Sequence, residues 1–167
     1  MRAIVNVTPQ WGIGNDNRLL VRIHEDMRRF RALTQHNTII IGRKTLETFP
    51  DGKPLKNREN IVFTRDPSFS AEDAVVCRDL AALRSLLSDR DPDSVFVCGG
   101  EQIYRLLLPY CKEALVTLTY QNLPADRFFP DLDRLSEWRI SERSELLWEH
   151  DVPYRFLTYR NTEVREL

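Results

Sequence analysis

Short runs rich in β-branched residues alternate along this chain with segments whose apolar residues recur at helical spacing. The run 38–42 (TIIIG) has the length and composition of a buried strand, whereas Leu80, Leu83 and Leu87 share one face of a helix that Asp79 is expected to cap. Strands that alternate with helices favour a mostly parallel sheet with helices on both faces. We expect strands at 2–8, 38–42, 60–64, 74–77, 94–98 and 113–120, and helices at 24–35, 43–48, 80–87 and 101–108.

The last third of the chain, 138–159, shows no clear helical period. It predicts two long strands around a turn near His150–Pro153, which would add an antiparallel hairpin at one edge of the sheet. The segment from Pro9 to about Ile23 is expected to be irregular. Because 167 residues suit one domain, we expect a single α/β domain over 1–167, with three doubly wound layers and about eight strands.

Charge and cysteine content exclude several classes of protein. The formal net charge is −1, from 24 Lys and Arg against 25 Asp and Glu, whereas a general nucleic-acid binder would show a basic surplus. No apolar run approaches the roughly 20 residues of a membrane span, and the segment before Pro9 is too short for a signal-peptide core. Cys77, Cys98 and Cys111 form no CxxC pair. We therefore expect a cytoplasmic protein without disulfides or a metal site.

One acidic residue, Asp26, falls inside an apolar stripe. At about 100° per residue it lies between Phe30 and Leu33 on the apolar side of the helix at 24–35, as the only charge there, with Arg29 on the other side. Burying an unpaired carboxylate raises its pKa, so Asp26 is a candidate proton donor or a clamp for a cationic ring. The alternative is that Asp26 only interacts favourably with the positive end of the helix dipole. This explanation suits the glutamate before it, which points outward, better than it suits Asp26.

Two further features suggest phosphate groups near the carboxyl ends of strands. Gly99–Gly100 separates a strand from a helix, where exposed backbone N–H groups suit a pyrophosphate, although a tight turn would look the same. Basic residues also follow two other strands, in Gly42–Thr45 and Thr64–Arg65, and together they suit a phosphomonoester. Taken alone, each of these residues is most simply explained as a solvated charge. Arg58, just before a strand, could bind a carboxylate. The dinucleotide GxGxxG motif and the GKS-type loop are both absent.

In this arrangement the sequence strongly resembles the dihydrofolate reductases of the bacterial single-domain type. Each matching segment is weak alone, but the ordered set is specific and runs over nearly the whole chain. The segments are WGIGNDNRLL (11–20), HEDMRRFRALT (24–34), IIIGRKTLETFP (39–50), PLKNRENIVFTRD (54–66), VFVCGGEQIYRLLLP (95–109), LVTLTY (115–120) and DRFFPDLD (126–133).

The resemblance implies an NADPH-dependent monomer that reduces 7,8-dihydrofolate to 5,6,7,8-tetrahydrofolate, supplies one-carbon metabolism and thymidylate synthesis, and binds antifolate inhibitors. Asp26 would support protonation of the pterin at N5, with Thr117 as its hydrogen-bonding companion. Arg58 would hold the glutamate α-carboxylate of the substrate, and Pro9–Val21 would form a lid. The other implied substrate contacts are Ile4, Val5, Met27, Phe30, Phe49, Leu55 and Cys98. The implied cofactor contacts are Asn6, Ile13, Gly14, Asn17, Leu19, Gly42, Arg43, Lys44, Thr45, Thr64, Arg65, Gly99, Gly100, Glu101, Gln102, Ile103 and Tyr104.

Five positions depart from the family pattern. Val21 stands where an aromatic residue is usual, and Leu20 and His24 stand where proline is often found. Asn6 stands where a small alanine is usual, and Gln102 where some members place an arginine. Two other functions are compatible with the residues: a related-fold NADPH reductase of a pyrimidine in riboflavin synthesis, and a nucleotide- or pterin-binding module without turnover. Arg58 together with Asp26 favours folate over the pyrimidine, because a carboxylated tail needs a partner such as Arg58. An acid on an apolar face disfavours a binding module without turnover.

Overall fold

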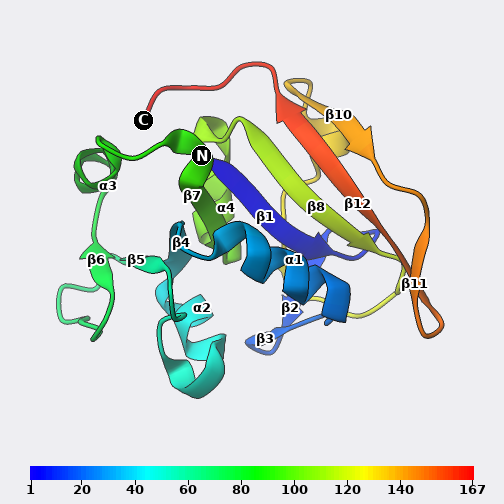
Figure 1. Ribbon diagram of the computed structural model, residues 1–167, viewed down its shortest axis with the longest axis horizontal. Helices are drawn as coiled ribbons and strands as arrows, with labels where there is room; N and C mark the ends of the chain where they lie inside the picture. Colours follow the sequence, from blue (N-terminus) through cyan, green and yellow to red (C-terminus); the bar gives the residue numbers. More distant parts are fainter.

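The computed structural model describes residues 1–167, and its main feature is a twisted nine-stranded sheet (Figure 1). The strand order is β10-β12-β8-β1-β7-β4-β5-β6, and β11 pairs with β12. All pairs from β8 to β6 are parallel, as the alternation predicts. The strands are β1 (Arg2–Val7), β4 (Thr38–Gly42), β5 (Glu59–Phe63), β6 (Val75–Cys77), β7 (Val95–Gly99), β8 (Glu113–Thr119), β10 (Trp138–Arg143), β11 (Leu147–Glu149) and β12 (Val152–Asn161).

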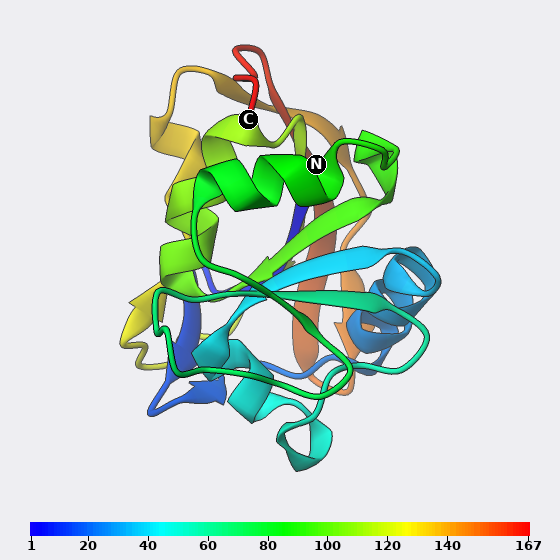
Figure 2. The ribbon, with the colours of Figure 1, turned by 90° about the vertical axis from the view of Figure 1, so that its left-hand side faces the viewer.

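Helices cover both faces of the sheet, which confirms the predicted three layers (Figure 2). Along β1, Ala3 and Val5 pack with the layer of α3 and α4, while Ile4 packs toward α1, because successive side chains of a strand point to opposite faces. None of the helices combines the length and apolar character needed to cross a bilayer. The helices are α1 (His24–Thr34), α2 (Arg43–Thr48), α3 (Leu80–Leu87) and α4 (Glu101–Leu107).

The start of α3 confirms the predicted cap. The Asp79 carboxylate accepts a hydrogen bond from the backbone N–H of Ala82 at 2.7 Å. This bond satisfies one of the N–H groups that a helix leaves without a partner in its first turn.

A second, three-stranded sheet was not expected from the sequence. It has the order β3-β2-β9, with β2 (Gly12–Asn15), β3 (Arg18–Leu19) and β9 (Arg127–Phe128). The prediction of an irregular segment from Pro9 to Ile23 is therefore wrong for its middle part. Asp16 and Asn17 both have positive φ and form the two-residue turn between β2 and β3, which matches the primed turns of tight hairpins. The third strand comes from more than 100 residues further along the chain, which local patterns do not reveal.

The C-terminal region contains three strands instead of the two predicted. The turn is where the sequence places it, since Glu149 pairs with Val152 across His150–Asp151. However, β10 and β11 are separate strands that pair with different parts of β12. The break between them begins at Ser144, whose backbone N–H still donates to the Phe156 carbonyl, but whose hydroxyl, and not its carbonyl, accepts a hydrogen bond from the Phe156 N–H.

Candidate functional site

The loops that follow β4 and β7 lie against each other at the carboxyl edge of the parallel strands. A Cβ on Gly100 would lie 3.3 Å from Thr45 Oγ1, and one on Gly42 would lie 3.1 Å from the Ile103 side chain. Gly99 has φ of 117°, a conformation that side chains rarely allow. The two strand-to-helix turns therefore make one close-fitting backbone surface, at the edge where open α/β sheets bind ligands.

Asp26 lies in the first turn of α1 and reaches two neighbouring strands. Its Oδ1 accepts a hydrogen bond from Thr117 Oγ1 on β8, and its Oδ2 accepts one from Asn6 Nδ2 on β1 at 3.1 Å. Burial raises the pKa of Asp26, while both hydrogen bonds and the charge of Arg29 oppose the rise. The helical period predicts this burial, and the family resemblance implies the hydrogen bond from Thr117, which the structure contains. The second donor, Asn6, was not predicted.

Arg29 was expected away from the apolar stripe, and this expectation is also wrong. Its side chain is half-buried, and its guanidinium carbon lies 4.4 Å from the centroid of the Phe156 ring. A planar guanidinium stacks well on an aromatic face, and Phe156 on β12 is the cross-strand partner of Thr117. Stacking on β12 therefore holds a positive charge of α1 on the same side of the helix as Asp26, and Asp26 is not the only charged group there.

Most of the predicted substrate pocket is assembled as a small apolar cluster next to Asp26. Its buried centre includes Ile4, and the other predicted members that pack against it are Phe30, Phe49, Leu55 and Cys98. Two predicted wall residues are not part of this cluster. The side chain of Val5 is buried on the opposite face of the sheet, because Val5 is adjacent to Ile4 on a strand. Met27 follows Asp26 on α1 and is 49% exposed, so its side chain is accessible to a ligand. Burial raises the pKa of the Cys98 thiol, which suits a packing residue and not a nucleophile.

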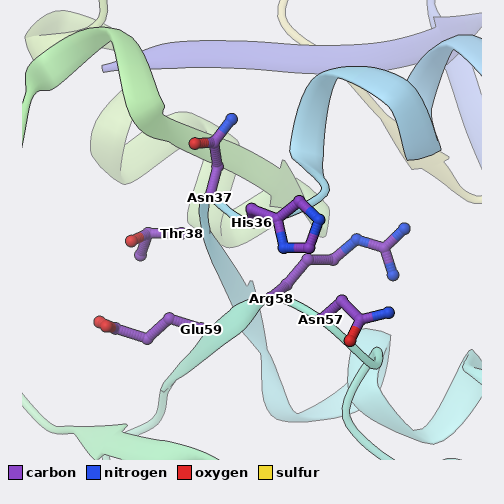
Figure 3. Close-up of a pocket in the computed structure, with 6 residues that line it drawn as sticks. All are labelled: His36, Asn37, Thr38, Asn57, Arg58 and Glu59. Atoms are coloured by element: carbon purple, nitrogen blue, oxygen red, sulfur yellow. The ribbon is translucent and has the colours of Figure 1, made fainter.

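Arg58 lies just before β5, beside the C-terminal half of α1. Its Nε donates to Thr34 Oγ1 and its Nη1 donates to the Lys56 carbonyl, each at 3.0 Å, so Nη2 is left for an anion. It lines an open cavity of about 460 Å³ with five polar residues, and Figure 3 shows its side chain extending past His36. The other lining residues are Asn37, Thr38, Asn57 and Glu59.

The predicted phosphate ligands meet at neighbouring strand ends. Strands β4 and β5 pair in parallel, so the exposed side chains of Arg43, Lys44 and Arg65 follow adjacent strands. Arg43 forms an ion pair with Asp66 at 3.3 Å. The guanidinium of Arg78 donates to the backbone carbonyl of Asp66, which supports the loop after β5.

These features fit a dinucleotide, since glycines permit close approach of a ligand to the backbone and clustered cations suit phosphates.

The remaining predicted cofactor residues lie on α4, directly after β5 and in the β2–β3 hairpin. Glu101 and Tyr104 on α4 already have internal partners: Glu101 Oε1 accepts from the Phe128 N–H at 2.8 Å, and the Tyr104 hydroxyl donates to the Ile4 carbonyl at 2.7 Å. Gln102 is exposed, Ile103 is buried and Thr64 is half-buried. Ile13, Gly14, Asn17 and Leu19 all lie on or at the turn of the β2–β3 hairpin.

That hairpin is attached to the segment that contains β9. The Asp126 carboxylate accepts a hydrogen bond from the Asp16 N–H at 3.0 Å, and the Asp126 N–H donates to the Gly14 carbonyl at 2.9 Å. Sequence reasoning missed this anchor. It also missed Thr119, which donates to Asn6 Oδ1 at 2.8 Å, although the alternation in T-L-T places Thr119 on the same face of β8 as Thr117.

No three His, Cys, Asp or Glu side chains lie close enough together to hold a metal ion.

Comparison with known proteins gives one consistent answer. The sequence profile of the family described as "Dihydrofolate reductase" matches residues 1–161. The dihydrofolate reductase of Bacillus subtilis is 35% identical over 149 residues, which cover 88% of this chain and 86% of the relative. That of Staphylococcus haemolyticus is 31% identical over 153 residues, with coverage of 92% and 89%.

A solved structure extends the similarity to the whole fold. It is the dihydrofolate reductase of Enterococcus faecalis, complexed with NADP(H) and RAB-propyl, which superimposes with a TM-score of 0.85 at 27% identity. The alignment covers 96% of this chain and 95% of that structure. Sequence, fold and the residues gathered around Asp26 agree with one another, and this chain belongs to the dihydrofolate reductase family.

Proposed function

We propose that this protein catalyses the NADPH-dependent reduction of 7,8-dihydrofolate to 5,6,7,8-tetrahydrofolate, with Asp26 as the only acid of the site. The observation that carries the proposal is the position of Asp26: a half-buried carboxylate, bound by two strands, beside the apolar cluster around Ile4. Its product would supply one-carbon metabolism and thymidylate synthesis. The whole chain, 1–167, is proposed to act as one domain.

The substrate is proposed to enter with its pterin ring against Asp26 and its tail toward Arg58. A carboxylate accepts hydrogen bonds from ring N–H groups, and Thr117 holds this carboxylate in place. The proposed apolar walls are Ile4, Phe30, Phe49, Leu55 and Cys98, which pack in one cluster. Asp26 supports protonation of the substrate at N5, since burial raises the pKa of its carboxyl.

NADPH supplies the hydride when it is bound. Arg43, Lys44 and Arg65 are proposed to bind its phosphate groups, and Gly99 and Gly100 to let its pyrophosphate approach the backbone. The role of the protein is to orient the two ring systems and to exclude water from them. The β2–β3 hairpin, which Asp126 anchors, is proposed as the lid.

Antifolate inhibitors are proposed to occupy the same pocket. A protonated, cationic ring would pair with ionised Asp26, which two hydrogen-bond donors and the charge of Arg29 favour.

We further propose that the enzyme works as a monomer in the cytoplasm. All three cysteines are free, which suits a reducing compartment. Light scattering of the purified protein that gave a dimer mass would contradict the monomer.

The direct test is to mix the protein with NADPH and dihydrofolate and to follow the loss of nicotinamide absorbance. We expect absorbance to fall only when both compounds are present. NADH and a pyrimidine substrate of riboflavin synthesis serve as the comparison compounds. Turnover with the pyrimidine and none with dihydrofolate would reject the proposed function.

A further inference from the structure

Asn6 on β1 lies beside Asp26, and both ends of its amide are occupied. Its Nδ2 donates to Asp26 Oδ2 at 3.1 Å, and its Oδ1 accepts from Thr119 Oγ1 at 2.8 Å. Thr119 is completely buried on β8. An amide oxygen cannot donate a hydrogen bond, so the Thr119 hydroxyl at one end directs the NH₂ group toward the carboxylate at the other.

The two oxygens of the Asp26 carboxylate are thus held by two different strands. Thr117 on β8 donates to Oδ1, and Asn6 on β1 donates to Oδ2. These strands are paired in parallel, with Asn6 directly opposite Thr117. With a single hydrogen-bond donor, the carboxylate could still rotate about the Cβ–Cγ bond of Asp26. Two hydrogen-bond donors on a rigid sheet fix the plane of the carboxylate. An N–H donor also stabilises the charged form of a carboxylate more than the neutral form.

We propose that Asn6 is a positioning residue of the reductase reaction, which fixes the plane of the Asp26 carboxylate and favours its ionised form in the ligand-free enzyme. The inference deepens the proposed function and rests on the role given there to Asp26. The family resemblance implies a cofactor contact for Asn6. In the structure its side-chain amide is hydrogen-bonded to Asp26 and Thr119.

The other groups that face Asp26 come from three elements. Arg29 on α1 is the nearby positive charge, and it favours ionised Asp26. Tyr104 on α4 and Tyr154 on β12 both have pKa values raised by burial, so both stay neutral around pH 7. Glu25 forms an exposed ion pair with Arg28 at 2.8 Å. None of these groups is altered by a change at position 6, so a changed titration of Asp26 reports the lost hydrogen bond.

The test follows the ¹³C resonance of the Asp26 carboxyl during a pH titration of the ligand-free, full-length protein, assigned with Asp26→Asn. We expect Asn6→Ala to move the midpoint to higher pH by more than about 0.3 pH unit, roughly a twofold change in the protonation equilibrium. Thr119→Val leaves Asn6 in place but frees its amide, and should move the midpoint in the same direction. Asn161→Ala removes a buried amide at the far end of β12, bonded to the Cys111 carbonyl, and should leave the midpoint unchanged.

The kinetic arm measures kcat/KM for dihydrofolate against pH. Asn6→Ala should lower the maximum of kcat/KM by roughly 5- to 10-fold, which corresponds to the loss of one hydrogen bond. The alkaline limb of the pH profile should move to higher pH by the same amount as the midpoint of the carboxyl titration. Coincident titration curves for the wild type and the Asn6 variant would overturn the inference. If Asn6→Ala does not fold, an unmoved midpoint in Thr119→Val would overturn it equally. Absence of turnover in the wild type would reject the proposed function, but the carboxyl titration would still decide the role of Asn6.

Discussion

At the scale of single residues, Asp26 shows how burial and hydrogen bonding act together on one group. Burial raises its pKa, and the donors Thr117 and Asn6 together with the charge of Arg29 limit the rise. The helical period of the sequence predicts that Asp26 faces the core. The period cannot predict its partners, because these come from β1, β8 and an arginine stacked on Phe156.

The first prediction concerns the acid itself. Asp26→Asn should reduce turnover of dihydrofolate at neutral pH by about 10²-fold or more, because the amide cannot support protonation of the substrate. Activity should recover partly at low pH, where the substrate takes a proton from solvent. The measurement is the pH profile of steady-state turnover, and unchanged turnover at pH 7 would remove Asp26 from the mechanism.

The second prediction concerns Arg58, which lies away from the reacting atoms. Arg58→Leu should weaken binding of dihydrofolate by roughly 10- to 100-fold, the value of a charge-assisted hydrogen bond to the tail carboxylate. Affinity for NADPH should stay within about twofold. Fluorescence titrations with each ligand make the comparison, with Arg143→Leu, from the exposed end of β10, as a matched control. Equal losses for both ligands would contradict the role of Arg58.

At the scale of elements, the sequence predicts those structures whose pattern is local. The parallel strands, the four helices and the Asp79 cap all follow from periodicity and capping rules. The three-stranded sheet does not, because β2 has no apolar alternation and its partner β9 is only two residues long. Likewise Val5 was assigned to the pocket from the family pattern, although the alternation of β1 directs its side chain to the opposite face from Ile4.

The third prediction concerns the anchor of the β2–β3 hairpin. Asp126→Ala removes the acceptor of the Asp16 N–H, so this amide should exchange its hydrogen faster, and turnover should fall by roughly 3- to 10-fold. Hydrogen exchange followed by NMR measures the first effect. Asp131→Ala is the control, since Asp131 makes the same kind of backbone contact, to Asp133, outside this sheet. An unchanged Asp16 amide would show that the Asp126 carboxylate does not anchor the hairpin.

At the scale of the whole molecule, the site should influence stability through pH. The pKa of Asp26 lies above its ordinary value of 3.8 in the folded protein, so Asp26 contributes most to stability in acid, and this contribution is lost as pH rises through the folded pKa.

The fourth prediction follows from this linkage. The free energy of unfolding of Asp26→Asn, relative to the wild type, should increase from about pH 4 toward neutral pH, because the variant buries no charge. Urea unfolding at several pH values measures it. Glu72→Gln is the matched control, since it removes a carboxyl group at an exposed site. A difference that is constant for Asp26→Asn would mean that the pKa of Asp26 is the same in the folded and unfolded chain.

The place of β1 in the sheet has a consequence for how the chain is made. In the chain β1 precedes both of its neighbours in the main sheet, since β7 begins at Val95 and β8 at Glu113. Contacts between such distant residues form slowly, because a long loop must close before they add stability. A growing chain on the ribosome would therefore carry β1 as an unpaired apolar strand until β7 has been made, and this strand is the segment that chaperones should bind.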